Sequence, residues 1–212
     1  MLRAAALALL LSACGRVNKP GLVVDFEDRD LSRWSLPEPK DWAIDLEGGN
    51  HFLRLARKGQ IGDPRRPLQY ALRTDVCVGD FDLRVRARRF GKSLLITFGY
   101  QDTMHFYYAH ISSDSGDHAV HNGLFKVDGG ERFRIAGKGS AAVLPEAGWQ
   151  EVRLTRRVGT GEMALYAGAD PQPRFRHTDA AFRFGRIGLG SFDETGDFDD
   201  LRLEGQASSE CR

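Results

Sequence analysis

The sequence predicts an all-β protein, built as an antiparallel β-sandwich or jelly roll with two packed sheets. Apolar and polar residues alternate with a period of two along about thirteen short segments, as in strands with one buried face. Short turns rich in glycine, asparagine and aspartate join these segments, for example Gly48-Gly49-Asn50. No segment has a sustained helical period, and no repeat has the length of a propeller blade. Many short strands without helices pack as two antiparallel sheets.

The expected strands follow one another along the chain after residue 21. Segment 81–90 (FDLRVRARRF) shows the pattern most clearly, because apolar residues occupy its odd positions through Ala87 and charged residues its even positions. Segments 149–158 and 198–205 alternate in the same way. The full set of expected strands is 22–27, 42–47, 51–57, 68–76, 81–90, 93–101, 104–112, 122–129, 132–137, 149–158, 161–168, 183–192 and 198–205.

The first residues predict export and lipid attachment. Arg3 is followed by an apolar run that is too short to cross a bilayer, and small residues precede Cys14. The stretch Leu-Ser-Ala-Cys resembles the lipobox of bacterial lipoproteins, which implies cleavage before Cys14 and a lipid on its sulfur. We therefore expect a signal peptide at 1–13, a lipid anchor and linker at 14–21, a β-jelly-roll domain at 22–205 and a tail at 206–212. The alternative is an ordinary signal peptide with an incidental cysteine.

The expected location is the bacterial cell envelope, on the periplasmic or outer face of a membrane, with the folded part in water. Such a compartment permits disulfides. Cys77 and Cys211 then either form a bridge that ties the tail to the domain, or Cys77 is buried alone and Cys211 is free. Their spacing is not that of a zinc site.

Charge and length limit the class of function. The chain has 30 basic and 29 acidic residues, so no net field favours nucleic acid as a partner. About 190 residues follow the predicted signal peptide and linker, enough for one well-buried domain.

Seven segments resemble motifs of a known superfamily and occur in its order; they are VVDFEDRDLSRW, GNHFLRLAR, FDLRVRARRF, GYQDTMHFYYAHIS, GWQEVRL, GRIGLGSF and FDDLRLEG. Together they resemble the concanavalin A-like jelly rolls, the lectin and glucanase superfamily, over residues 22–205. Among its branches the chain is similar to bacterial LamG-like domains and to the 3-keto-disaccharide hydrolase domain family. The resemblance implies a two-sheet jelly roll and a carbohydrate or glycoside partner, but it does not single out one activity.

Four of the six histidines lie close together in the sequence. They are His105, His110, His118 and His121. Side chains an odd number of residues apart on a strand point to opposite faces, so His105 is split from His110 and His118 from His121. A metal site of four histidines would need a bulge or a loop. A pair such as His110 with His118 or His121 could meet across the intervening turn.

Within segment 104–112, alternation predicts two faces that both carry aromatic residues. One face holds Phe106, Tyr108 and His110, and the other holds Tyr107, Ala109 and Ile111. The resemblance implies that a concave sheet face binds glycans through aromatic rings and polar side chains. The candidate carbohydrate-binding residues are Tyr108, His110, Arg88, Arg86, Tyr100, Gln101, His118, His121 and Trp42. The alternatives are that these residues pack the sheet, with their polar ends satisfied by backbone, or that the histidines bind a metal.

Carboxylates could serve catalysis or a metal ion. A retaining glycanase of this superfamily would carry two carboxylates on one strand, as E-x-D-x-x-E, and this motif is missing, although histidine and tyrosine can also transfer protons. The resemblance further implies a structural calcium ion between the first and last strands, held by oxygen ligands. Its expected ligands are Asp25, Glu27, Asp199 and Asp200. The alternative is two solvated acidic edges.

We expect a lipid-anchored, extracytoplasmic domain that binds carbohydrate, with no organic cofactor. One alternative is an enzyme that cleaves glycosides and resembles the 3-keto-disaccharide hydrolases. The other is a non-catalytic interaction module of the cell envelope.

Overall fold

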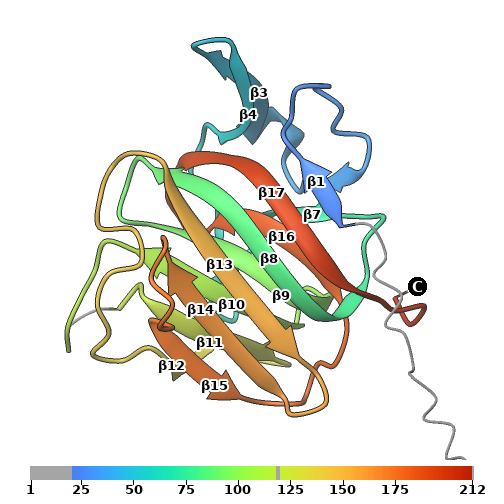
Figure 1. The fold of residues 1–212 in the computed structure, drawn as a ribbon, viewed down its shortest axis with the longest axis vertical. Coiled ribbons are helices and arrows are strands. Elements are labelled where there is room, and N and C mark those ends of the chain that lie inside the picture. The colour runs from blue at the N-terminus through green and yellow to red at the C-terminus, as the bar shows by residue number, and fades with distance from the viewer. Residues whose placement is uncertain (1–20, 118–119, 212) are drawn as a thin grey trace, which may run out of the picture.

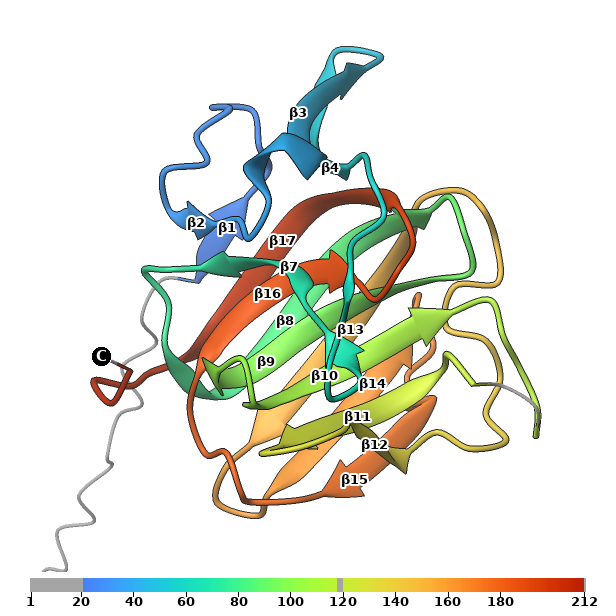
Figure 2. The same cartoon turned by 180° about the vertical axis from the view of Figure 1, so that it is seen from behind.

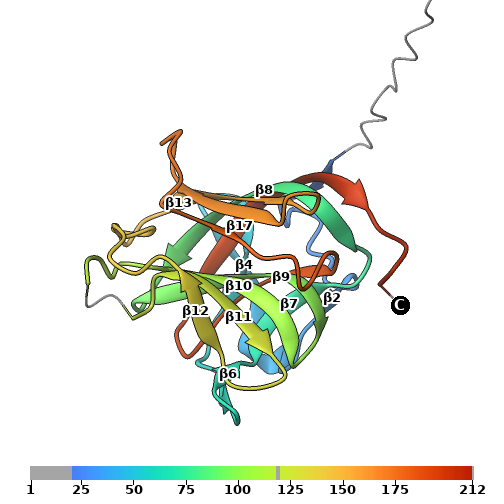
Figure 3. The same ribbon diagram turned by 90° about the horizontal axis from the view of Figure 1, so that it is seen from below.

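The computed structural model describes residues 21–117 and 120–211, and in this part of the chain two antiparallel sheets pack face to face (Figures 1 and 3). This confirms the predicted β-sandwich. The predictions for the signal peptide, the linker, Cys14 and His118 concern residues outside the described ranges.

Sheet A is the eight-stranded sheet. Its path runs from β15 (Phe175–Thr178) through β14 (Glu162–Ala167), β13 (Gln150–Arg157), β8 (Val78–Arg89), β17 (Gly196–Ala207) and β4 (Asn50–Leu55) to β3 (Trp42–Glu47), with β1 (Leu22–Val24) paired to β17. The β3–β4 hairpin projects beyond the body of the sandwich (Figure 1).

Sheet B is the seven-stranded sheet, seen from its outer side in Figure 2. It runs from β12 (Phe133–Ala136) through β11 (Gly123–Asp128), β10 (His105–Ser112), β9 (Ser93–Asp102), β16 (Arg186–Ser191) and β7 (Gln69–Arg73) to β2 (Trp34–Ser35). A separate pair, β5 (Ile61–Gly62) and β6 (Arg66–Pro67), forms a small hairpin on the side of sheet B that faces away from sheet A (Figure 3). A single 3-10 turn, η1 (Pro39–Asp41), precedes β3.

Each expected strand has a counterpart in the structure. The four that the sequence did not indicate are the short strands β2, β5, β6 and β15. Three of them have only two residues and the fourth has four, which is too short for a period of two to be recognised.

The main core lies between the two sheets and is built by alternation. Leu83 and Val85 of β8 point inward from sheet A, and Phe98 and Tyr107 point inward from sheet B. Phe98 and Tyr107 stack with ring centroids 5.4 Å apart. Each fully buried aliphatic side chain contributes about 1.5–3 kcal/mol to folding.

Segment β10 has the two faces that alternation predicts. Tyr107, Ala109 and Ile111 belong to the core between the sheets. Phe106 and Tyr108 belong to a second apolar cluster on the outer face of sheet B, the face turned away from sheet A. Both faces are therefore buried, which explains why the pattern could not identify the core face.

A disulfide joins Cys77 to Cys211, so of the two alternatives for these cysteines the structure has the bridge. Strand β17 also continues to Ala207. The C-terminal residues are thus tied to the sandwich immediately before β8. In the described part of the chain, no helix is long and apolar enough to cross a membrane.

Candidate functional site

One row of side chains crosses the outer face of sheet B. Tyr108 of β10 lies directly opposite Thr97 of β9 on one side and Phe125 of β11 on the other. Phe125 in turn lies opposite Arg134 of β12. Directly opposed residues share a face of a sheet. The row therefore begins with buried polar and aromatic residues and ends with Arg134 at the edge of the sheet.

The floor of this region is a layer of buried rings. Tyr108 and Phe125 stack nearly parallel, with centroids 5.0 Å apart and 9° between their planes. His110 lies beside Phe192, with centroids 6.1 Å apart and 19° between planes. Tyr108 and His110 have no exposed surface, and Phe125 and Phe192 are 4% and 2% exposed. The rings are therefore closed off from solvent by the groups above them.

Three guanidinium groups cover these rings. Arg132 lies 4.8 Å above the Phe125 centroid and 4.5 Å above that of Phe192. Arg134 lies 5.3 Å above Phe125, and Arg65 lies 4.9 Å above Phe192. Such stacking binds a cation to the electron-rich face of a ring and leaves the edge of the guanidinium group for hydrogen bonds.

Arg132 is also fixed from below, because its Nη1 donates a hydrogen bond of 3.0 Å to the Tyr108 hydroxyl. A backbone hydrogen bond holds Arg65 near Arg132, because the Arg132 amide donates to the Arg65 carbonyl oxygen at 2.9 Å. This bond joins the turn between β5 and β6 to the residue that precedes β12. The β5–β6 hairpin thus serves to carry Arg65 to the outer face of sheet B.

Gly123 allows β12 to approach β11 at this place. Its φ is +147°, and a Cβ atom there would lie 2.3 Å from the Ala136 carbonyl oxygen. The register between β11 and β12 shifts at Leu124 and Phe125, next to this contact. A larger residue would push away the strand that carries Arg134.

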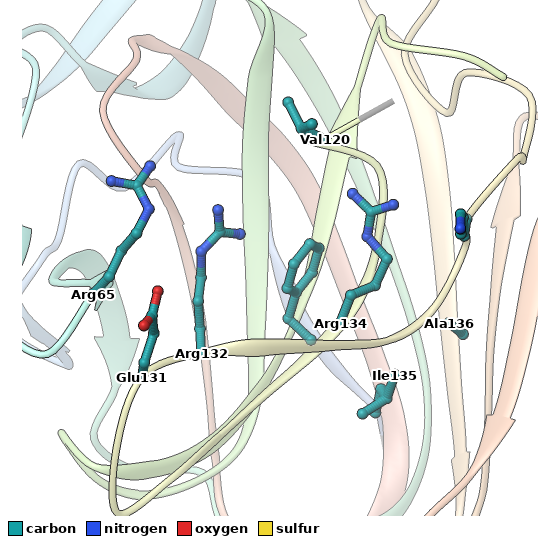
Figure 4. Close-up of a pocket in the computed structure, with 9 residues that line it drawn as sticks. Arg65, Val120, Glu131, Arg132, Arg134, Ile135 and Ala136 are labelled. Atoms are coloured by element: carbon teal, nitrogen blue, oxygen red, sulfur yellow. The ribbon is translucent and has the colours of Figure 1, made fainter. Parts of the chain in front are cut away.

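A cavity of about 490 Å³ opens above this layer, with Arg65, Arg132 and Arg134 extending side by side in the same direction (Figure 4). This volume is within the range of small-molecule sites. The lining residues in the described part of the chain are Arg65, Val120, Phe125, Glu131, Arg132, Arg134, Ile135, Ala136 and Lys138.

The electrostatics of the cavity are strongly positive. The lining includes three arginines and a lysine against one carboxylate, Glu131. Burial, followed by repulsion from Arg132, lowers the pKa of Arg134 from its ordinary value. Burial raises the pKa of Tyr108, so its hydroxyl stays protonated. The arrangement offers several donors to an incoming ligand and few acceptors.

His110 contributes no charge to this field. Burial, followed by the charges of Arg132 and His121, lowers its pKa well below the ordinary value. Its Nε2 lies 2.9 Å from the Ser93 hydroxyl, and its Nδ1 has no hydrogen-bond partner in the described residues. It meets His121 edge to face at 5.5 Å, so the expected approach of His110 to a histidine across the turn is present.

The prediction that Tyr108 and His110 touch a sugar directly needs correction. Both side chains are completely buried beneath Phe125, Phe192 and Arg132, so neither presents a surface to a ligand. They support the floor of the cavity instead. His121 is half-buried and its Nδ1 pairs with Asp114 at 2.7 Å.

The predicted grouping of Arg86 and Arg88 with Tyr108 is also wrong. Both arginines lie on β8 in sheet A, on the other side of the sandwich. Arg88 binds Asp197 through Nε and Nη2 at 2.9 and 2.6 Å and Glu47 through Nη1 at 2.6 Å. Arg86 binds Asp200 at 2.9 Å. Their donors serve ion pairs within the protein.

The remaining candidates are scattered. Trp42, expected as a sugar platform, is 6% exposed and packs in the core between the sheets. Tyr100 is half-exposed and meets Tyr70 edge to face at 5.5 Å, and the adjacent Gln101 is exposed. Neither Tyr100 nor Gln101 lines the cavity of Figure 4.

The expected calcium ligands do not fit a single ion site. Glu27 uses both carboxylate oxygens on the amide and ring of His51, and Asp199 accepts from Asn50 at 2.9 Å. Asp200 pairs with Arg86, and Asp25 accepts from the Glu27 amide. Across residues 21–117 and 120–211, no group of three or more histidine, cysteine, aspartate or glutamate side chains is placed to hold a metal. Calcium binding stays a prediction that this arrangement does not favour.

Sequence reasoning missed the residues that line the cavity. Alternation in the expected strand 132–137 puts Arg132 and Arg134 on one face, and this signal was available. Nothing in the sequence links them to Arg65, which reaches them through the β5–β6 hairpin.

No protein-family profile matches the chain, and no curated protein sequence matches it significantly. Several solved structures share its fold. The carbohydrate-binding module CBM66 from Bacillus subtilis has a TM-score of 0.60 and 15% identity, covering 82% of this chain and 96% of the module. Lectin I-B4 from Griffonia simplicifolia, in a metal-free form, has a TM-score of 0.52 and 11% identity, covering 86% and 97%. A Bacillus subtilis protein of unknown function with a galectin-like fold has a TM-score of 0.55 and 9% identity, covering 90% and 99%.

Proposed function

We propose that this protein is a carbohydrate-binding domain, and that the sugar occupies the cavity bounded by Arg65, Arg132 and Arg134. The observation that carries the proposal is the set of guanidinium donors held over a buried aromatic layer in an open cavity of about 490 Å³. Sugar hydroxyls accept hydrogen bonds from such fixed donors, and ligand sites combine an apolar wall with a few convergent polar groups.

The fold supports this proposal by analogy. A carbohydrate-binding module and a lectin share the sandwich, although at this identity the likeness concerns the fold alone. Binding fits the cavity better than hydrolysis does, because most glycosidases use a pair of carboxylates. Among the described lining residues, Glu131 is the single carboxylate.

The proposal can be tested on a glycan array followed by calorimetry with each ligand that binds. The test variants are Arg65→Ala and Lys138→Ala, since both side chains are exposed and their removal leaves the core intact. We expect each to weaken binding about tenfold, the value of one or two charge-assisted hydrogen bonds.

Arg202→Ala is the matched control, because Arg202 is an exposed arginine of β17 in sheet A. It should leave affinity unchanged. Absence of binding to every glycan, or equal affinities for the Arg65 and Arg202 variants, would contradict the proposal.

We also propose that the mature protein is anchored to a bacterial membrane through a lipid on Cys14. The support is the sequence Leu-Ser-Ala-Cys after a short apolar run. Mass spectrometry of the N-terminal peptide should show a lipid-modified Cys14. Release of the Cys14→Ser variant into the soluble fraction is the matching expectation, and an unmodified cysteine in membrane-bound protein would contradict it.

A further inference from the structure

We propose that the sugar bound in this cavity is acidic, and that its carboxylate or sulfate group is bound by Arg65 and Arg132. This inference rests on the proposed function, because it specifies the ligand of the same site.

The balance of charge in the cavity favours an anion. Among the described residues that line the cavity, four side chains are basic, including Lys138, and one is acidic, Glu131. No described carboxylate forms an ion pair with the guanidinium group of Arg65 or Arg132, whereas each of four arginines elsewhere binds one, namely Arg54, Arg86, Arg88 and Arg153. A neutral ligand would leave the positive charge of Arg65 and Arg132 uncompensated. An anion would neutralise it.

The arginines also have a fixed orientation. Arg132 stacks on Phe125 and Phe192 and donates to the buried Tyr108 hydroxyl, so its position is set before a ligand arrives. Arg65 stacks on the same Phe192 ring at 4.9 Å. Two guanidinium groups that share one ring can address the same anionic group with planar, paired donors.

The positive charges of the cavity lie close enough to affect one another. Burial and the neighbouring Arg132 disfavour the charged form of Arg134. His110, which lies below the arginines, is buried and neutral. Like charges in proximity repel each other. An anion bound between them offsets that repulsion, which favours an acidic ligand over its neutral analogue.

The test compares matched ligands by calorimetry. Oligogalacturonate and its fully methyl-esterified form share one backbone and differ in charge, and a sulfated oligosaccharide with its desulfated counterpart forms the second pair. We expect the acidic member of at least one pair to bind at least about tenfold more tightly. Raising NaCl from about 0.05 to about 0.5 M should weaken that binding, because salt screens partly exposed charges.

The variants separate charge from shape. Arg132→Lys keeps the charge but loses the paired donors and should bind the acidic sugar about tenfold more weakly. Arg202→Ala, on the other sheet, should not change the preference. Equal affinity for acidic and neutral members would overturn the acidic inference while the carbohydrate proposal stands. Failure of these ligands together with every glycan on the array would overturn both.

Discussion

The outer faces of the two sheets use arginine in opposite ways. On sheet A, Arg54 and Arg88 clamp Asp197, which has no exposed surface, and Glu47 completes the coordination of Arg88. On sheet B, Arg65 and Arg132 stack on phenylalanine rings, and the hydrogen-bond acceptor of Arg132 is a neutral hydroxyl. Guanidinium groups cover aromatic rings on both faces, since Arg54 and Arg88 also lie over Phe52. Among the described residues, however, only the arginines named on sheet A are paired with carboxylates.

This difference distinguishes arginines that stabilise the fold from arginines that are available to a ligand. Arg88 also lies over aromatic rings, with Trp149 at 4.7 Å and Phe52 at 5.3 Å. By residue type alone, that cluster resembles a sugar site as closely as the cavity on sheet B does. The buried carboxylate decides between them, since a donor already bound to Asp197 is not available to a ligand.

The largest expected effect tests whether Asp197 neutralises the arginines on the outer face of sheet A. Replacing Asp197 with alanine leaves Arg54 and Arg88 partly buried without their shared anion, and we expect the free energy of unfolding to fall by about 3 kcal/mol. Denaturant unfolding measures this, with sugar affinity unchanged. Asp45→Ala is the control, because Asp45 is 40% exposed in its pair with Arg54 and should cost less than about 1 kcal/mol. Similar decreases in the free energy of unfolding for both variants would show that the buried Asp197 does not stabilise the arginines of sheet A more than the exposed Asp45 does.

The next effect concerns the neutral histidine under sheet B. The unfolded chain binds a proton at His110 below its ordinary pKa of 6.5, whereas the folded chain does so only at much lower pH. This contribution to stability is present above pH 6.5 and is lost as pH falls. The free energy of unfolding should therefore fall below pH 6.5 with a slope of at most about 1.4 kcal/mol per pH unit.

His110→Gln keeps a polar group for Ser93 and removes the titration. Its unfolding free energy should therefore be lower at pH 7 but flatter towards pH 5, as thermal melts at both values would show. An unchanged slope would contradict the buried neutral state of His110.

A smaller effect tests how Arg132 is held in place. Tyr108→Phe keeps the ring but removes the hydroxyl that accepts from Arg132, and it should cost about 1 kcal/mol of stability. Affinity for the acidic sugar should fall a few fold, because Arg132 then has more freedom before binding. Tyr166→Phe is the matched control, since Arg153 stacks on that ring in sheet A at 5.0 Å. Both its stability and its affinity should stay close to those of the unchanged protein.

The sequence predicted the sandwich well, because period-two alternation is a local property of each strand. It placed Phe106 and Tyr108 on one face of β10 and Tyr107 on the other. It could not tell that both faces are covered, since the covering groups come from elsewhere in the chain. Phe192 follows β16, and Arg132 precedes β12.

The site could be predicted less well for the same physical reason. Alternation correctly turned Arg88 away from the core, yet its partner Asp197 is 109 residues distant in sequence. Whether an outward arginine is neutralised or available depends on such non-local pairs. Arg132 and Arg65 are available arginines, and their proximity also depends on a non-local element. That element is the β5–β6 hairpin, whose strands are too short to be recognised in the sequence.

The most direct test of the central claim, that sheet B presents the binding face, is an NMR titration of the isotope-labelled protein with oligogalacturonate and with the sulfated oligosaccharide. We predict that chemical shifts change around Val120, Arg132, Arg134 and Lys138 and remain constant around Trp149 and Asp197. Shifts concentrated at Trp149 and Asp197 on sheet A would contradict the account.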